Sequence, residues 1–258
     1  MIATVHGMVT NTDADRFVAE GFLKLEEAFP RETGDRIREA LWQQVGLSPD
    51  RPGDWTQPVV WAAPDPMGRG PFGEAVRGPA LAEALDLLAG KGGWEPRGTI
   101  GNTPIRFPHP SDAGDTGWHI DQNDPGPGGA WGTVTARSRT LLVLMLFSEV
   151  SPDDAPTRIR VGSHLDTARV LEPHGERGLD FFAAAPLIDE ASAHRPVALA
   201  TGLPGDAYVC HPYLVHAAQP HHGTRPRFMS QMPFMLTEPL VPGAATPLAR
   251  AAGLGLAG

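Results

Sequence analysis

The chain has 258 residues, of which 41% are hydrophobic and 20% are charged, with 21 basic against 30 acidic side chains and one cysteine. The apolar share can fill a core and excludes a disordered chain, and the single cysteine excludes a disulfide scaffold. The net charge of −9 argues against nucleic-acid binding, and the lack of an apolar stretch near the ~18 residues of a membrane span argues against insertion.

The first 93 residues carry the helical signals. Apolar residues recur at helical spacing, and proline and glycine stand where a helix would begin or end. We predict three helices, at 13–20, 30–46 and 79–90. The stretch 48–73 is rich in proline and glycine and is predicted as an irregular loop.

After residue 93 the sequence changes to short apolar runs bounded by Gly, Pro, Asp or Ser, which is typical of a β sandwich or barrel. Strands are predicted at 98–107, 140–147, 157–161, 197–200, 207–215 and 228–236. Between them we find no helical pattern of the kind that βαβ units require. The sequence therefore predicts a single domain, 1–258, made of a helix-rich part (about 1–93), a double-sheet β core (about 94–240) and a short C-terminal tail.

The segment Trp118-His119-Ile120-Asp121 holds the first candidate site. In an extended strand, side chains two residues apart leave the same face, so the His119 imidazole and the Asp121 carboxylate would lie side by side. Such a pair supplies two arms of a 2-His-1-carboxylate site, which binds ferrous iron and leaves coordination positions open. Alone, this spacing is a weak signal, because surface strands and helix caps also contain it.

His216 is the candidate for the third ligand. It ends an apolar run that follows a turn at Gly205-Asp206, so its imidazole would point from a β wall into the interior. The alternative is a core histidine bonded to a backbone carbonyl. Arg227, eleven residues further on and across a polar turn, favours the ligand, because a hairpin of that length returns the chain beside His216.

An arginine at this place has a chemical use. 2-Oxoglutarate chelates iron through its keto-acid end and leaves a second carboxylate free, which a planar guanidinium binds with two parallel hydrogen bonds. Arg225 competes for this role, since it stands two residues earlier and nominally on the same strand face. We favour Arg227, because Arg225 still lies in the turn ahead of Pro226.

Together these residues resemble the phytanoyl-CoA dioxygenase family of Fe(II)/2-oxoglutarate-dependent oxygenases. Four elements occur in the family's order: an opening segment at 17–29, the Trp-His-x-Asp element, a segment at 151–164 ending in Gly-Ser-His, and Gly-Asp ahead of the distal histidine and arginine. The resemblance implies a mainly β fold, a double-stranded β-helix (jelly-roll, cupin-like) core with flanking helices. It also implies Fe(II) held by His119, Asp121 and His216, 2-oxoglutarate as co-substrate bound by Arg227, and O2.

The sequence departs from the family at Ala218. The family often has a serine two residues after the distal histidine, where it helps to bind the co-substrate carboxylate. Either another hydroxyl serves here or the pocket is looser, and Thr140 is our candidate substitute. Asp121 is retained, whereas related halogenating enzymes have a small residue at that place, and this favours oxygen insertion.

We therefore predict a dioxygenase (hydroxylase) that oxidises an unactivated C–H bond of a small molecule in secondary or specialised metabolism, releasing succinate and CO2. Desaturation or ring rearrangement would use the same oxidant. The Gly/Pro-rich segment 123–139 is predicted as a mobile flap over the substrate. The candidate substrate contacts are Trp118, Asn123, Trp131 and Arg106. The alternatives are a cupin-like metal-binding protein or isomerase that uses the same ligands without 2-oxoglutarate, and a degenerate, inactive relative.

The remaining expectations concern partners and location. No basic start followed by an apolar block opens the chain, so we expect no secretory signal and a cytoplasmic protein. A large CoA ester would be expected to need a positively charged surface that binds its phosphates, and the net charge of −9 with only two lysines gives no sign of one. A smaller natural-product or amino-acid-like substrate is therefore expected. We expect no nucleic-acid or membrane partner, and the sequence leaves a homo-oligomer open.

Overall fold

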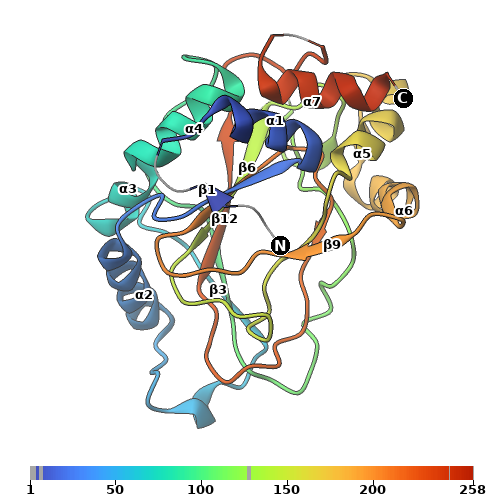
Figure 1. Ribbon diagram of the computed structural model, residues 1–258. Helices are drawn as coiled ribbons and strands as arrows, with labels where there is room; N and C mark the ends of the chain where they lie inside the picture. The colour runs from blue at the N-terminus through green and yellow to red at the C-terminus, as the bar shows by residue number, and fades with distance from the viewer. Residues whose placement is uncertain (1–3, 6–7, 127–128, 244, 258) are drawn as a thin grey trace.

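The computed structural model describes residues 4–5, 8–126, 129–243 and 245–257 (Figure 1). The helices among them are α1 (Asn11–Glu20), α2 (Arg31–Val45), α3 (Pro71–Val76), α4 (Pro79–Ala89), α5 (His164–Leu171), α6 (Phe181–Ser192) and α7 (Pro247–Leu256). The strands are β1 (Thr4–Val5), β2 (Phe22–Leu25), β3 (Val59–Ala62), β4 (Thr103–Arg106), β5 (Thr133–Val134), β6 (Thr140–Leu146), β7 (Arg158–Arg160), β8 (Leu179–Asp180), β9 (Val197–Leu199), β10 (Ala207–Cys210), β11 (His216–Ala217) and β12 (Met229–Met235).

Two sheets form the β core. The larger has the strand order β1-β2-β10-β6-β12 and is antiparallel except for its β1–β2 edge, and the smaller, antiparallel sheet has the order β11-β7-β9. Strand β6 is buried along its whole length because both of its faces are covered. Its odd-numbered residues, such as Val143, pack in the core cluster that includes the helices, and its even-numbered residues, such as Leu144, pack in the cluster shared with the smaller sheet. This two-sided burial explains the continuous apolar run in the sequence.

The helices cover the larger sheet from outside. In Figure 1, α1, α4 and α7 gather at one end of β6 and β12, while α2 and α3 lie along the side. Helix α1 begins at a capping box, in which the Thr10 hydroxyl and the Asp13 carboxylate each accept the other residue's backbone N–H, and it ends at Gly21 in the left-handed conformation (φ 87°). The three helices predicted for the first 93 residues are confirmed as α1, α2 and α4.

Four further helices correct the prediction. Helices α5 and α6 lie between β7 and β9, α3 begins inside the stretch predicted as a loop, and α7 forms in the predicted C-terminal tail. Their local signals are weak: α6 contains Pro186, and α7 contains Gly253 and Gly255. Tertiary packing compensates, since a Cβ on Gly255 would stand only 2.7 Å from the Leu165 carbonyl oxygen of α5. The predicted architecture is confirmed, but helices contain more of the described residues than strands do.

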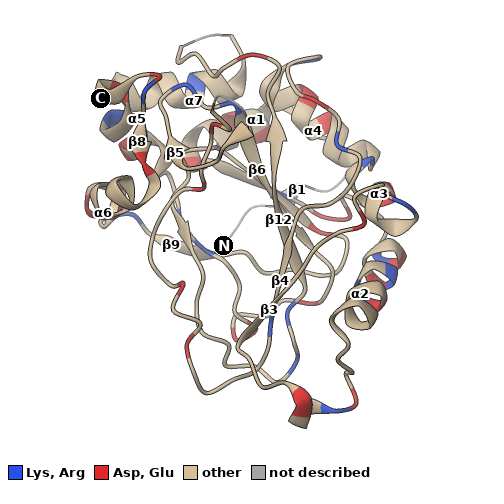
Figure 2. Ribbon diagram, turned by 180° about the vertical axis from the view of Figure 1, so that it is seen from behind, with Lys and Arg blue, Asp and Glu red and all other residues tan. Residues whose placement is uncertain are grey.

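Charged residues lie mainly outside the β core. Figure 2 shows acidic and basic residues mixed along the ribbon of α2, whereas β6 and β12 contain neither. Within the described ranges, every helix is too short or too polar to cross a bilayer.

A buried histidine joins α5 to α1. His164 is fully buried, and its Nε2 donates a hydrogen bond to the Val18 carbonyl oxygen at 3.0 Å. Its ring faces that of His211 at 5.1 Å, and its Nδ1 has no partner among the described residues. Burial lowers the pKa of His164 from its usual 6.5 to about 4. The residue is therefore neutral at pH 7 and has a structural role.

This histidine makes stability depend on pH in the acid range. The unfolded chain protonates His164 below pH 6.5, whereas the folded protein resists protonation down to about pH 4. We therefore expect the free energy of unfolding to decrease as the pH is lowered from about 6.5 to about 4, with a contribution from His164 of at most about 3 kcal/mol. Urea unfolding between pH 7.5 and 4.5 measures the slope, which should be shallower in His164→Asn. An unchanged slope in His164→Asn, equal to that of a variant at the exposed His222, would contradict the assignment.

Candidate metal centre and its two cavities

His119, Asp121 and His216 meet at one point although they are far apart in the sequence. Asp121 Oδ1 lies 3.8 Å from His119 Nε2 and 3.5 Å from His216 Nε2, and the donor atoms all lie within 4.8 Å of one another. The two histidines form an antiparallel bridge, exchanging backbone N–H···O hydrogen bonds of 3.0 and 2.9 Å. Side chains of such a pair leave the same face of the sheet, which brings the two imidazoles together.

Backbone carbonyls set the tautomer of both rings. His119 Nδ1 lies 2.9 Å from the Gly117 oxygen, and His216 Nδ1 lies 3.0 Å from the Leu214 oxygen. A carbonyl oxygen only accepts, so each Nδ1 carries the proton and each neutral ring presents its Nε2 lone pair to the shared point. Two nitrogen lone pairs and one carboxylate oxygen are the donors of a 2-His-1-carboxylate iron site, so these residues fit that metal.

Charge and burial act together on these three groups. Burial lowers the pKa of His119, and the neighbouring His216 lowers it further. Burial also acts to lower the pKa of His216, but the Asp121 carboxylate outweighs it and raises this pKa above its usual value. For Asp121 itself burial acts to raise the pKa, and the two imidazoles hold it below its usual value. Asp121 is thus an ionised carboxylate at neutral pH, as metal binding requires.

Two sequence motifs outside the cluster position the His216 strand. In the Gly-Ser-His segment, Gly162 takes a left-handed conformation (φ 79°), and the Ser163 hydroxyl accepts a 2.8 Å hydrogen bond from the Val215 N–H. In the Gly-Asp turn, the buried Asp206 carboxylate accepts the Leu203 N–H at 3.0 Å, which holds the turn ahead of β10. These motifs support the ligand strand from behind and contribute no ligand themselves.

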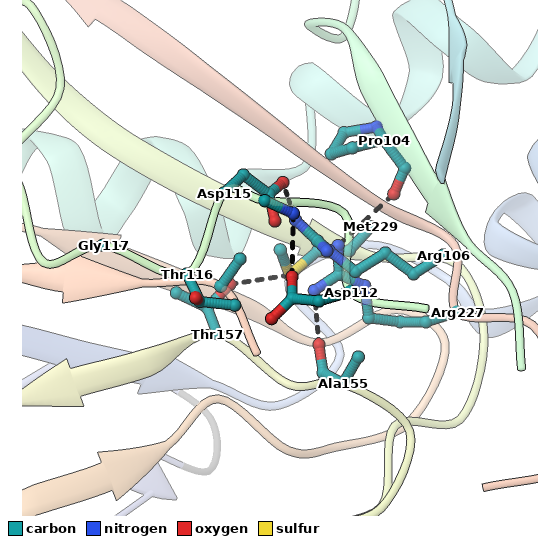
Figure 3. Close-up of polar contacts among 12 residues, drawn as sticks. Pro104, Arg106, Asp112, Asp115, Thr116, Gly117, Ala155, Thr157, Arg227 and Met229 are labelled. Carbon is teal, nitrogen blue, oxygen red and sulfur yellow. Dashed lines mark hydrogen bonds and ion pairs between the residues drawn. The ribbon is translucent and has the colours of Figure 1, made fainter. Parts of the chain in front are cut away.

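Arg227 lies next to this cluster with its guanidinium fully buried. Nη1 donates to the Ala155 oxygen at 2.6 Å and Nη2 to the Pro104 oxygen at 3.3 Å, while Nε has no partner among the described residues. Its backbone pairs with that of Arg106, whose own guanidinium binds the Asp115 carboxylate (Figure 3). Burial lowers the pKa of Arg227, and the charge of Arg106 lowers it further. Two guanidinium groups beside one carboxylate leave an excess positive charge, which favours an anion.

Arg225, the competitor for the same role, lies elsewhere. Its side chain is 63% exposed and forms a 3.0 Å ion pair with Glu149 at the surface. It lines a surface pocket on the other side of the turn, away from His216. The structure therefore brings only Arg227 of these two arginines to the metal cluster.

The cluster stands where two cavities meet. The larger cavity, of about 920 Å³, is lined by Asp121 and Trp131 among others. Trp61 and Gln231 line both cavities. The smaller, of about 460 Å³, is lined by His119, His216, Arg106, Arg227, Thr157 and Ala218. The two imidazoles thus face the cavity with the buried arginines, and the carboxylate faces the larger one.

Thr157 offers a hydroxyl in the same cavity as Arg227. In the pairing of β11 with β7, Ala217 stands opposite Arg158, so the next position places Ala218 opposite Thr157 on the same face. Thr157 is buried and lines the smaller cavity, with a 3.9 Å contact from its hydroxyl to the Met229 sulfur. Thr140, the predicted substitute, begins β6 and lines the larger cavity. The structure does not bring Thr140 to Arg227, and finding Thr157 requires the strand register, which the sequence does not show.

Three of the four predicted substrate contacts line a cavity beside the metal centre. Trp131 lines the larger cavity, whereas Trp118 and Arg106 line the smaller one. The Trp118 ring lies between the guanidinium groups of Arg158 and Arg160, at 4.5 and 4.3 Å. These cation–π contacts fix the tryptophan beside His119.

Asn123 lines neither cavity, which corrects its predicted role. It is buried, and its side-chain amide exchanges hydrogen bonds with the Thr135 backbone at 3.1 and 2.8 Å. The predicted flap 123–139 includes residues 127 and 128, which lie outside the described residues. Its two ends are joined by a 2.8 Å bond from the Arg139 N–H to the Asn123 oxygen. The base of this segment is thus tied into the fold.

Comparisons with known proteins agree with this arrangement. The sequence profile of the phytanoyl-CoA dioxygenase (PhyH) family matches residues 82–229, and no curated protein matches the chain. Similar solved structures include SnoN, a non-heme alpha-ketoglutarate-dependent epimerase from nogalamycin biosynthesis (15% identity, 87% of this chain and 80% of that one, TM-score 0.58). They also include EvdO2 from Micromonospora carbonacea var. aurantiaca (17% identity, covering 95% of this chain and 98% of that one, TM-score 0.56). A third is HygX from Streptomyces hygroscopicus, solved with nickel, 2-oxoglutarate and hygromycin B (14% identity, covering 89% of this chain and 88% of that one, TM-score 0.57). These likenesses confirm the predicted jelly-roll fold with flanking helices.

Proposed function

The chain belongs to the phytanoyl-CoA dioxygenase family, and we propose that it is an Fe(II)- and 2-oxoglutarate-dependent oxygenase acting on a small molecule. The observation that carries this proposal is that the smaller cavity is lined both by two oriented imidazoles and by a buried guanidinium that binds no carboxylate of a described residue. A cupin-like metal binder without 2-oxoglutarate would have no use for that guanidinium. The reaction proposed is oxidation of an unactivated C–H bond to an alcohol, with release of succinate and CO2.

His119, Asp121 and His216 would hold the iron. When bound, the metal together with 2-oxoglutarate and O2 supplies the oxidising power, which no amino-acid side chain provides. These three residues would supply the protein donors, and a 2-His-1-carboxylate site of this kind would leave room for exchangeable ligands. Phe181 packs edge-on against His119 with ring centroids 5.6 Å apart, and Trp118 lies at the same wall. Both rings line the smaller cavity together with the imidazole.

Arg227 would bind the far carboxylate of 2-oxoglutarate. A carboxylate beside Arg106, Arg227 and Asp115 would bring two positive and two negative charges together, which removes the excess charge of the buried pair. The guanidinium is held in place by two backbone oxygens, so little conformational entropy is lost when an anion binds. We propose that the Thr157 hydroxyl donates a further hydrogen bond to this carboxylate.

The substrate would occupy the larger cavity, on the Asp121 side of the metal. Support comes from its volume, which lies within the ~300–1,000 Å³ range of small-molecule sites. SnoN is named for a natural-product pathway and HygX was solved with an antibiotic bound, which is consistent with a small-molecule substrate here. SnoN is named an epimerase, so analysis of the product distinguishes the proposed alcohol from an epimer of the substrate.

Release of succinate tests the proposed function directly. The protein is incubated with Fe(II), ascorbate, 2-oxoglutarate and a panel of natural-product substrates under air. We expect iron-dependent succinate formation that at least one substrate stimulates, and mass spectrometry of that substrate should show one added oxygen. Failure of 2-oxoglutarate to bind to the iron-loaded protein would contradict the proposal.

Two matched threonine variants test the assignment of the co-substrate hydroxyl. Thr157→Val should raise the KM for 2-oxoglutarate about tenfold, because one hydrogen bond to a charged group contributes roughly 1.5 kcal/mol. Thr140→Val makes the same chemical change in the larger cavity and should leave this KM unchanged. Ala218→Ser in the Thr157→Val background should restore part of the affinity, since the two positions face each other. If instead Thr140→Val raises the KM for 2-oxoglutarate and Thr157→Val does not, the hydroxyl that binds the co-substrate carboxylate is that of Thr140.

A further inference from the structure

The larger cavity carries recognition groups that binding of the metal and 2-oxoglutarate does not use. At about 920 Å³ it is twice the size of the cavity with the arginines. It reaches the metal centre only through Asp121, and most of its wall comes from residues 61–66, 97–102 and β12. The chemistry of that wall is therefore evidence about the substrate.

Three carboxamide side chains line this cavity, from Asn102, Gln122 and Gln231. Within the described part of the chain, none of these three side chains forms a hydrogen bond to another residue. Asn123 offers a contrast, since its amide is fully engaged with the backbone of Thr135. A carboxamide both donates and accepts, so it pairs with hydroxyl and amide groups and prefers neither an anion nor a cation. Gln231 also lines the smaller cavity, which His119 and His216 line as well.

Two tryptophans add flat apolar surface to the same wall. Trp61 is 58% exposed and Trp131 is 44% exposed, although side chains of this size are usually well buried. By contrast, Trp42 and Trp55 are partly buried and stack on each other, with ring centroids 6.0 Å apart. Exposed indole rings at a cavity present faces that pack against the rings and C–H faces of a ligand.

The charged groups of the cavity are already engaged. Asp121 belongs to the metal centre. Arg97 donates Nη1 to the Pro233 oxygen at 2.6 Å and Nε to the Thr99 oxygen at 3.2 Å. No other described residue that lines the cavity carries a charge. An ammonium group would find no carboxylate except the metal ligand. An anion would find only the Arg97 guanidinium, which already donates to two backbone oxygens and, unlike Arg227, has no second arginine beside it among the residues lining the cavity.

We infer that the larger cavity takes an uncharged, ring-bearing substrate with several hydroxyl groups, of the chemical type of a glycosylated polycycle. This inference rests on the proposed function in taking that cavity as the substrate site. The carboxamides bind the hydroxyl groups, the indoles pack on the rings, and the shortage of free charges selects against acids, amines and CoA esters. An amino-acid-like substrate, one of the sequence-based expectations, fits this wall poorly because both of its charges would lack partners.

A matched pair of ligands tests the inference on the metal-free protein. Calorimetric titration is carried out with the isoflavone daidzein as its 7-glucoside and as its 7-glucuronide, which differ by a hydroxymethyl against a carboxylate, and with acetyl-CoA. We expect the glucoside to bind at least tenfold more tightly than the glucuronide, and acetyl-CoA not to bind. Gln231→Leu and Trp131→Ala should each weaken glucoside binding at least fivefold. Met67→Ala is the control, because Met67 is 75% exposed on the loop that follows β3, next to cavity residue Pro66, and does not itself line the cavity.

Two results would overturn the inference. One is the absence of glucoside binding. The other is binding of the glucuronide or of acetyl-CoA that is as tight as glucoside binding or tighter. If Arg97→Gln abolishes that binding of the anionic ligand, the substrate is an anion held by Arg97. These titrations need neither iron nor 2-oxoglutarate, so they are independent of the succinate assay. Glucoside binding by a protein whose iron-loaded form does not bind 2-oxoglutarate would contradict the proposed function, while the chemistry of the ligand assigned to this cavity would stand.

Discussion

His216→Ala is expected to bind almost no Fe(II) and to form no succinate from 2-oxoglutarate. The substitution removes one of three donors and leaves His119 and Asp121 with an incomplete site. Loss of a group that merely supports a metal ligand costs roughly 10- to 100-fold, so loss of the ligand itself should cost more than 100-fold. Anaerobic titration with Fe(II), followed by colorimetric iron analysis after desalting, measures the stoichiometry.

A surface histidine provides the control for this experiment. His222 lies exposed in the turn after β11, so His222→Ala removes an imidazole without touching the cluster. It should bind iron and form succinate like the unaltered protein. Thermal unfolding of His216→Ala establishes that the chain still folds. Stoichiometric iron in a folded His216→Ala protein would show that the metal, if bound, is held by other residues.

Arg227→Ala should raise the KM for 2-oxoglutarate at least 100-fold while iron binding stays near its normal stoichiometry. Truncating one partner of a buried charge pair costs about 2–5 kcal/mol, and 2.7 kcal/mol corresponds to 100-fold. Arg227→Lys should recover little of this loss. A lysine keeps the charge, but it lacks the planar fork that binds a carboxylate and also reaches the Ala155 and Pro104 oxygens.

The chain offers a matched arginine for comparison. Arg225 is two residues away, exposed and paired with Glu149, so Arg225→Ala should leave the KM for 2-oxoglutarate unchanged. Steady-state succinate formation and equilibrium binding of 2-oxoglutarate to iron-loaded protein measure both variants. If Arg225→Ala and Arg227→Ala behave alike, the buried guanidinium does not bind the co-substrate.

The sequence was most informative where the signal was local. The stripe of Leu81, Leu85 and Leu88 predicted α4, because an amphipathic helix declares itself within a dozen residues. Helix α6 was missed, since Pro186 in its middle argues against a helix and only packing against the rest of the fold compensates. Strand β6 was recognised because it is buried on both faces and so reads as one apolar run.

The same division holds for the site. His119 and Asp121 are two residues apart, so their proximity follows from the alternation of a strand, and a buried arginine after a distal histidine has few uses other than binding an anion. Thr157 and Asn123 could not be assigned in this way. Whether Thr157 faces Ala218 depends on the register of two strands, and whether the Asn123 amide is free depends on Thr135.

By itself, the sequence determined which chemical groups are available and which of them neighbour each other along a strand, and so it identified the donors of the metal centre and the arginine beside it. Only the tertiary structure decided which cavity each polar side chain lines, and our proposals for the hydroxyl that binds the co-substrate and the amides that bind the substrate rest on that placement. The physical reason is that side-chain direction within a strand follows from local backbone geometry, whereas the pairing of distant strands results from burial and hydrogen bonding over the whole chain.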